Sequence, residues 1–255
     1  GRSRSAFRVS AATAIGSALA GRIADPREQP MPAATVVERM TAADAVIARP
    51  ASDPASVPLV RGDTIRPVPA ARPIVGTLRG VVLLELPDRF STEALLPQGP
   101  RVWRHRTDLT ALAGHLYAGI DAGFARRARA HGGGFVVAGT DYGIGAPQPH
   151  ALLALIQLGV RAVIAASFAE AHRAEMVRYG ILPLRSDGHP SRLRRGDELE
   201  IPGLPDGLER NKPLVVRNLT RGTQISLHHG LADREIEIVR TGGLLYAGLA
   251  SGLAR

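Results

Sequence analysis

Hydrophobic and polar residues follow their most regular pattern between Gly132 and Leu184. Short apolar runs there predict buried strands, and longer stretches with apolar residues every three or four positions predict helices. Ser167 is placed to cap the second helix, and Gly180 to end it. Strands that alternate with helices pair in parallel through right-handed crossovers. The expected order is strand 135–138, loop 139–149, helix 150–159, strand 161–166, helix 168–180 and strand 181–184.

The pattern is weaker on both sides of this region. Residues 10–22 predict a helix with Ser10 as N-cap and Gly21 at its end. Residues 26–73 hold nine of the nineteen prolines, which predicts a linker with one short helix near 34–40. The other predicted elements are a strand at 81–86, two short helices within 109–131, strands at 198–201, 214–218 and 223–227, and a helix at 233–241.

Length and composition are those of a folded protein without a membrane span. The chain has 255 residues, of which 45% are hydrophobic, and this is enough to bury a core. No apolar run is long enough for a transmembrane helix, and no signal-peptide pattern opens the sequence. A cytoplasmic protein without a membrane partner is therefore the default expectation.

The formal net charge of +9 raises the question of a nucleic-acid partner. Of the 32 basic residues only Lys212 is lysine, and the arginines are spread along the whole chain. Aromatic residues make up only 4% of the sequence, too few for a platform on which bases stack. RNA binding through the arginine-rich surface remains a third-ranked alternative to a solvated basic surface.

Cysteine is absent from the chain. This excludes disulfide bonds, thiolate catalysis and any cysteine ligand that the chain itself would supply to zinc or to an iron–sulfur cluster. No metal site is expected in this chain.

The loop at 139–150 is the first candidate for chemistry. It joins a predicted strand to a predicted helix, where free amides and the helix dipole favour an anion. Gly143 and Gly145 would let the backbone approach a ligand closely, and a simple tight turn is the alternative.

This region resembles the swivel domain of the aconitase family. Residues 132–184 read GGGFVVAGTDYGIGAPQPHALLALIQLGVRAVIAASFAEAHRAEMVRYGILPL. The family loop usually reads YGxGSSREHA and is followed by LGxRAVIAxSFARIHxxNxxxxGILPL, with the same spacing. Further upstream, LRGVVLLELPDRFSTEALLPQG resembles the family's TTDHIxPAG segment, and HRTDL resembles its YRSNI segment. The opening GRSRSAFRVSAATAIGSALAGRIADPR resembles the close of the preceding domain.

The resemblance implies an α/β fold: an aconitase-like swivel domain with a mixed, partly parallel sheet and flanking helices. The implied division is the end of the third α/β domain at 1–25, a linker at 26–73 and the swivel domain at 74–255. It also implies a hydro-lyase of the aconitate hydratase type, which dehydrates and rehydrates a citrate-like tricarboxylate or dicarboxylate on a 4Fe-4S cluster.

The family's cluster cysteines lie outside the swivel domain, so the cluster is expected on parts absent from this chain. The cluster-bearing partner would be the N-terminal domains of a longer chain or a separate large subunit. Because residues 1–5 fall inside a family motif, the sequence is expected to be a piece of a longer chain.

Carried over position by position, the resemblance implies a substrate site with altered chemistry. Arg2 and Arg106 match arginines that hold substrate carboxylates, for which a planar guanidinium is suited. Gly143 and Gly145 belong to the loop that covers the substrate. The base serine of that loop is replaced by Ala146, so no intact catalytic residue is expected.

The neighbouring positions of the loop depart from the family as well. The carboxylate-binding arginine is replaced by Gln148, which can offer only a neutral hydrogen bond. Pro147 and Pro149 remove two backbone N–H donors. In the upstream segment, Glu93 and Ala94 replace the family's Asp and His.

The sequence therefore supports a hydro-lyase whose loop is degraded or retuned, and a non-catalytic family member used for binding or assembly is the alternative. Which acid is bound stays open at this point. Trp103, the single tryptophan, is expected in the core, and His172 is expected to be packed or hydrogen-bonded.

Overall fold

The computed structural model describes residues 7–29, 51–53, 56–58, 60, 62, 63, 71 and 73–250. Contacts divide the chain into two compact units, residues 1–59 and 60–255. The domain boundaries expected from the sequence stay predictions.

The smaller unit contains the α-helix α1 (Ala11–Ala20) and the 3-10 turn η1 (Pro26–Glu28). The Ser10 hydroxyl accepts a hydrogen bond from the Thr13 N–H at 3.1 Å, and Gly21 ends the helix at a φ of 65°. This confirms the helix predicted at 10–22. The helix predicted near 34–40 lies outside the described residues.

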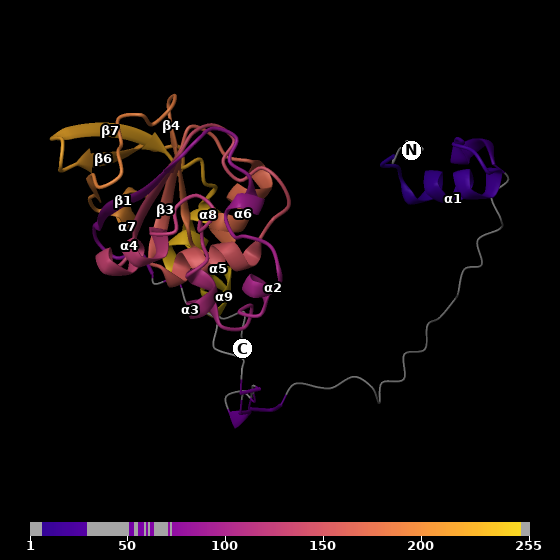
Figure 1. Ribbon diagram of the computed structural model, residues 1–255, viewed down its shortest axis with the longest axis horizontal. Coiled ribbons are helices and arrows are strands. Elements are labelled where there is room, and N and C mark those ends of the chain that lie inside the picture. Colours follow the sequence, from indigo (N-terminus) through magenta and orange to yellow (C-terminus); the bar gives the residue numbers. More distant parts are fainter. Residues whose placement is uncertain are drawn as a thin grey trace. The chain divides into compact units, whose positions relative to one another are not determined.

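A closed barrel forms the centre of the larger unit (Figure 1), with the strand order β1-β2-β3-β4-β7-β6-β5. Neighbouring strands from β1 to β4 pair in parallel, and the remaining neighbours in the barrel pair antiparallel. The predicted mixed α/β character is confirmed, whereas closure of the sheet was not predicted. The strands are β1 (Leu78–Leu86), β2 (Gly134–Ala138), β3 (Val160–Ala165), β4 (Leu182–Ser186), β5 (Glu198–Ile201), β6 (Leu214–Asn218) and β7 (Thr223–His228).

Helices cover the outside of the barrel (Figure 1). None of the helices within the described ranges is long and apolar enough to cross a membrane. The last one, α9, was not predicted from the sequence. The remaining elements are η4 (Thr92–Ala94), α2 (Pro100–Trp103), α3 (Leu109–Ala113), α4 (Phe124–His131), α5 (Pro149–Gln157), α6 (Glu170–Arg178), α7 (Leu204–Gly207), α8 (Asp233–Thr241) and α9 (Leu244–Ala250).

Two hydrophobic clusters hold the larger unit together, one on each face of the strands. Successive side chains of a strand point to opposite faces. Accordingly Phe135 and Val137 of β2 belong to one cluster, which also includes residues of all the other strands. Val136 belongs to the other cluster, together with residues of α3, α4 and α5. This alternation fixes the register in which β2 lies between its neighbours.

Ser167 does not cap α6, so that prediction is wrong. The helix begins at Glu170 with Ala169 as its N-cap. Ser167 instead accepts a hydrogen bond from the Asp141 N–H at 2.7 Å, and the Ala169 N–H donates to the Tyr142 carbonyl at 3.0 Å. The chain after β3 is thus hydrogen-bonded to the loop after β2, which delays the start of the helix.

An aromatic seat supports the loop after β2, and we use this name for the side chains of Phe90, Tyr117, Tyr142, Phe168 and His172. Tyr142 is fully buried at its centre, with the rings of Phe90, Phe168 and His172 at 6.1, 6.0 and 5.2 Å. Its hydroxyl lies 2.9 Å from that of Tyr117. Burial raises the pKa of both phenols, so both stay protonated and one can donate to the other.

His172 is buried beneath the same loop, with 1% of its surface exposed. Among the described residues neither ring nitrogen has a hydrogen-bond partner, and burial lowers the pKa of His172 to about 4. A Cβ on residue 143 would lie only 2.2 Å from Cδ2 of this ring, and the φ of Gly143 is 87°. Both facts require glycine at position 143.

The tyrosine pair gives a first prediction. Tyr117→Phe or Tyr142→Phe alone leaves a buried hydroxyl without its partner, and each should lower the free energy of unfolding by about 1–3 kcal/mol. The double variant should cost clearly less than the sum of the two, because neither hydroxyl then remains unpaired. Urea unfolding of the four proteins measures this coupling, and strictly additive losses would show that the hydroxyls do not interact.

His172 gives a second prediction, on stability against pH. Between about pH 4 and 6.5 the unfolded chain binds a proton at this histidine that the folded chain does not, so stability falls as the pH is lowered through this range. The loss is on the order of 3 kcal/mol. His172→Leu should flatten this part of the curve of unfolding free energy against pH. His189→Gln, at an exposed position, should leave the curve unchanged; equal effects of the two would refute the assignment.

Candidate functional site

The segment from Gly139 to His150 is called the site loop below; it consists of the loop after β2 and the first two residues of α5. It crosses the carboxyl ends of the parallel strands. Its Tyr142 N–H donates to the Ser167 carbonyl at 3.0 Å, after β3. Its next residue, Gly143, donates to the carbonyl of Phe90 at 2.8 Å, after β1. Ligands of α/β proteins bind at this edge of the sheet. The loop lies where the sequence predicted it, and its role as a binding site stays a prediction.

The turn after β1 packs tightly against the site loop. The Thr92 hydroxyl donates to the Ala146 carbonyl at 2.7 Å, and its N–H donates to the Ile144 carbonyl at 2.8 Å. A Cβ on residue 145 would lie 2.8 Å from the Thr92 hydroxyl oxygen, and the φ of Gly145 is 112°. Sequence reasoning missed Thr92, although it stands at a threonine of the TTDHIxPAG pattern.

Asp88 holds the beginning of the site loop. Its carboxylate accepts a hydrogen bond from the Thr140 N–H at 2.6 Å, and this bond lowers the pKa of Asp88. A Cβ on residue 139 would lie 2.0 Å from the same carboxylate oxygen, so Gly139 is required by close approach. The beginning and the middle of the loop are therefore held by polar groups of the turn after β1.

The far end of the site loop is tied to α2 by side chains. Gln98 donates from Nε2 to Oε1 of Gln148 at 3.3 Å and accepts from the indole N–H of Trp103 at 3.2 Å. The Trp103 ring also contacts His150, with centroids 5.5 Å apart. Trp103 is 39% exposed, so its expected place in the core is wrong: its indole N–H needs a polar partner, which it finds at this rim.

Arg106 follows α2 in a tight turn in which its N–H donates to the Trp103 carbonyl. In such a turn residues three apart share a face, which places Arg106 on the same side as Trp103. Its side chain is exposed and has no ion pair within the described ranges. Arg2 lies outside the described residues, so its meeting with Arg106 at a substrate stays a prediction.

The exposed middle of the site loop offers backbone groups rather than reactive side chains. Ala146 has no side-chain oxygen, and Pro147 has no N–H. The amides of Gly145 and Ala146 donate to no acceptor in the part of the chain that the structure describes. This arrangement can bind a carboxylate through N–H groups, but Ala146 cannot accept a proton. Glu93 is exposed in η4 and Ala94 half-buried, beside the loop but not hydrogen-bonded to it.

The residues present do not fit a metal or a cluster. The sequence has no cysteine, and no group of three His, Asp or Glu side chains in the described ranges could hold an ion. A 4Fe-4S cluster therefore finds no ligand set among these residues.

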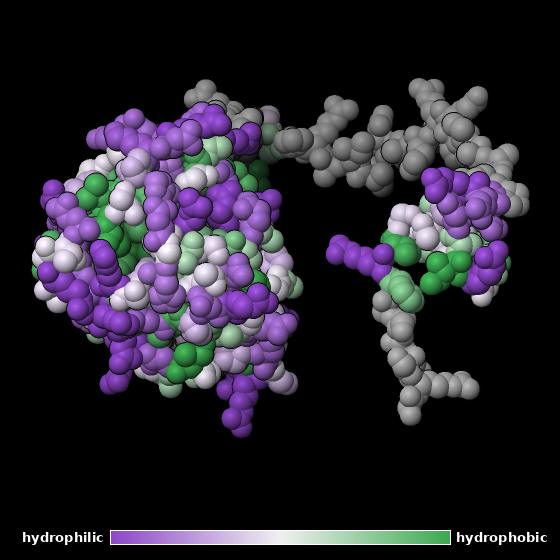
Figure 2. Space-filling view, turned by 90° about the horizontal axis from the view of Figure 1, so that it is seen from above, coloured by the Kyte–Doolittle hydropathy of each residue, from purple (hydrophilic) through white to green (hydrophobic). Residues whose placement is uncertain are grey.

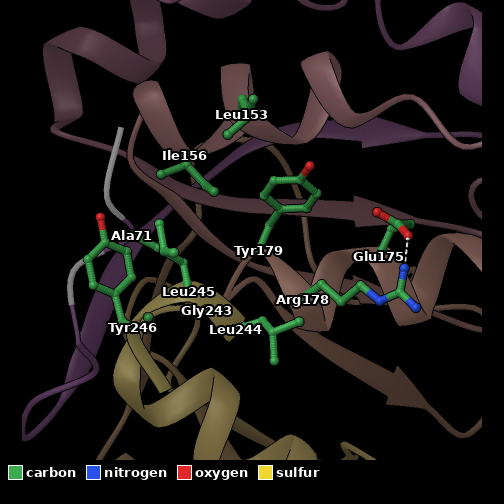
Figure 3. A pocket seen from close by; sticks show the side chains of 11 residues that line it. Ala71, Leu153, Ile156, Glu175, Arg178, Tyr179, Gly243, Leu244, Leu245 and Tyr246 are labelled. Carbon is green, nitrogen blue, oxygen red and sulfur yellow. Dashed lines mark hydrogen bonds and ion pairs between the residues drawn. The ribbon is translucent and has the colours of Figure 1, made fainter. Parts of the chain in front are cut away.

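A further cavity, of about 460 Å³, lies between α5, α6 and α9 (Figure 3). Its wall is largely apolar, with Leu153, Ile156, Leu244 and Leu245, and an ion pair joins Arg178 to Glu175 at its edge. None of the residues that the sequence predicted for the site lines it. We do not assign the substrate to this cavity.

The basic charge is distributed rather than concentrated. Hydrophilic residues cover most of the face of the larger unit seen in Figure 2, with hydrophobic residues in small patches between them. Many arginines pair with acids, for example Arg79 with Glu198 and Arg217 with Glu200.

Three comparisons with known proteins agree with this geometry. The aconitase C-terminal domain family matches residues 121–188. The 3-isopropylmalate dehydratase small subunit of Pyrobaculum calidifontis is 35% identical over 158 residues, which are 62% of this chain and 89% of that protein. The methanogen homoaconitase small subunit of Methanocaldococcus jannaschii is 31% identical over 158 residues, which are 62% of this chain and 84% of that protein.

A solved structure of a 3-isopropylmalate dehydratase from Methanocaldococcus jannaschii superposes with a TM-score of 0.58 at 26% identity, covering 70% of this chain and 96% of that chain. The family match spans β2, β3 and β4 together with the site loop. Together with the near-complete coverage of the small subunits, they establish that the chain belongs to the aconitase family, of which it carries the swivel-type C-terminal domain.

Proposed function

We propose that this chain is the substrate-covering part of a hydro-lyase that isomerises a hydroxy acid with two or three carboxylates. The observation that carries the proposal is the position of the site loop at the carboxyl ends of the parallel strands. Two of its amide N–H groups, those of Gly145 and Ala146, donate to no acceptor among the described residues. The names of the relatives, a 3-isopropylmalate dehydratase and a homoaconitase, support this class of reaction. Within this class of acids, a citrate-like acid is the proposed substrate.

In this proposal the chain binds and encloses the substrate and leaves proton transfer to other parts of the enzyme. The N–H groups of Gly145 and Ala146 hold one carboxylate, and Arg106 holds another in a planar grip. Arg2 is assigned the same role from its place in the family motif. Gln148, held by Gln98, closes the end of the loop. A dehydration removes a proton as well as hydroxide, and Ala146 cannot take that proton.

The 4Fe-4S cluster would be bound by another chain or segment. Relatives named small subunits support a separate large subunit as the partner. Because the sequence has no cysteine and the described residues offer no ligand set, no residue is assigned to the cluster.

A non-catalytic family member is the second candidate. The exposed Ala146 and Pro147 and the half-buried Gln148 favour it, because none of their side chains can exchange a proton at neutral pH. Such a protein would keep the closed loop for binding alone.

We expect slow hydration of cis-aconitate, which the serine and arginine of the family pattern at positions 146 and 148 should accelerate. The chain, purified from its own cells with its accompanying cluster-bearing part and reconstituted anaerobically, should hydrate cis-aconitate slowly. Ala146→Ser combined with Gln148→Arg should raise that rate at least about a hundredfold, since general-base catalysis alone contributes about that much or more. Absorbance of the unsaturated acid measures both rates, with 3-isopropylmalate as a second substrate.

A matched control makes the same chemical changes at exposed positions away from the loop, namely Ala130→Ser with Gln224→Arg, and should leave both rates unchanged. Fast cis-aconitate hydration by the unaltered protein would contradict the binding-only role of the loop. No turnover of either acid, before or after the substitutions, would overturn the hydro-lyase proposal in favour of the non-catalytic candidate.

A further inference from the structure

A polar cavity, of about 410 Å³, opens on the same edge of the barrel as the site loop, on the other side of Ser167. It lies where β4 and β7 are joined by only two residue pairs, Arg185 with His228 and Ser186 with Leu227. Its volume is in the range of small-molecule sites. The lining residues are Ser167, Phe168, Glu170, Arg173, Pro183, Arg185, His228, His229 and Gly230.

One positive charge in this cavity is not neutralised within the described part of the chain. Arg173 is paired with Glu170 at 3.1 Å and with Glu235 at 3.0 Å. His228 faces Asp187 at 3.5 Å. Arg185, at the end of β4, is exposed and has no ion pair with a described carboxylate. A guanidinium in this position suits a carboxylate or phosphate, which it can bind with two parallel hydrogen bonds.

The cavity shares hydrogen bonds with the start of the site loop. Ser167, in its wall, accepts from the Asp141 N–H at 2.7 Å and donates to the Asp141 carboxylate at 3.2 Å. The Ser167 carbonyl accepts from the Tyr142 N–H, and the Ala169 N–H donates to the Tyr142 carbonyl. A ligand that presses on this wall therefore acts on the residues that anchor the loop.

We propose that this cavity is a binding site for a small anion with one carboxylate or phosphate group, held by Arg185, and that its occupancy is transmitted to the site loop through Ser167. The site is separate from the substrate position beneath Gly145 and Ala146, and it does not depend on any activity of the protein. A carboxylate and a phosphate share the required chemistry, so both serve as probes.

The test is an NMR titration of the full 255-residue chain with inorganic phosphate and, separately, with propionate, at constant ionic strength kept with sodium chloride. At least one of the two anions should shift the amide signals of Arg185 and Ser167 with a saturating curve. The amides of Asp141 and Tyr142 should follow the same curve, because they are bonded to Ser167. The anion that binds more tightly shows whether the natural ligand binds through a phosphate or through a carboxylate group.

Arg185→Gln should weaken this binding at least about tenfold, and Arg185→Lys, which keeps the charge without the planar fork, should have an intermediate effect. The matched control is Arg217→Gln, an exposed arginine on β6, which should change the affinity less than twofold. Linear shifts equal to those caused by chloride, or unchanged binding in Arg185→Gln, would overturn the site. Saturating shifts that stop at Ser167 would overturn its coupling to the loop.

Discussion

The candidate site depends on the way the chain leaves β2. The side chain of Tyr142 turns into the core, where its hydroxyl meets that of Tyr117 and its ring lies among the aromatic seat. With this ring fixed, the next residues must run along the carboxyl edge of the barrel rather than into solvent. His172 occupies the space beside Gly143, and the turn after β1 closes the other side through Thr92. The loop is preorganised before any ligand arrives, which lowers the entropic cost of binding.

This rigidity is combined with a lack of titratable side chains at the exposed residues Gly145, Ala146 and Pro147. The resemblance to the aconitase family implies that Ala146 and Gln148 stand where the family has a base serine and a carboxylate-binding arginine, and this correspondence stays a prediction. The aromatic seat determines the backbone path of the site loop, whereas the exposed residues Gly145, Ala146 and Pro147 determine which chemical groups the loop presents. Binding geometry and reactivity are thus separable in this fold. Membership of the family establishes the architecture of the chain, whereas the chemistry of its site loop belongs to the proposed function.

The sequence predicted elements whose local signals agree with their surroundings. The strands at 198–201 and 214–218 and the helix at 233–241 have the predicted bounds, because alternation and capping residues are local signals. Serine is a favoured N-cap residue, but the hydroxyl of Ser167 is hydrogen-bonded to Asp141, a residue distant in the sequence. Barrel closure and the contact of Trp103 with His150 also join distant segments, and no periodicity in one segment reports them. The loop was located through strand order and resemblance, whereas its anchors Asp88 and Thr92 became visible only in three dimensions.

Amide hydrogen exchange along the site loop of the free chain tests most directly whether the loop is preorganised. The Tyr142 and Gly143 amides, bonded to carbonyls after β3 and β1, should exchange at least about a hundred times more slowly than unfolded peptide, whereas the Gly145 and Ala146 amides should exchange almost as fast as unfolded peptide. Fast exchange at all four amides would contradict the account, because the aromatic seat would then not hold the loop in place.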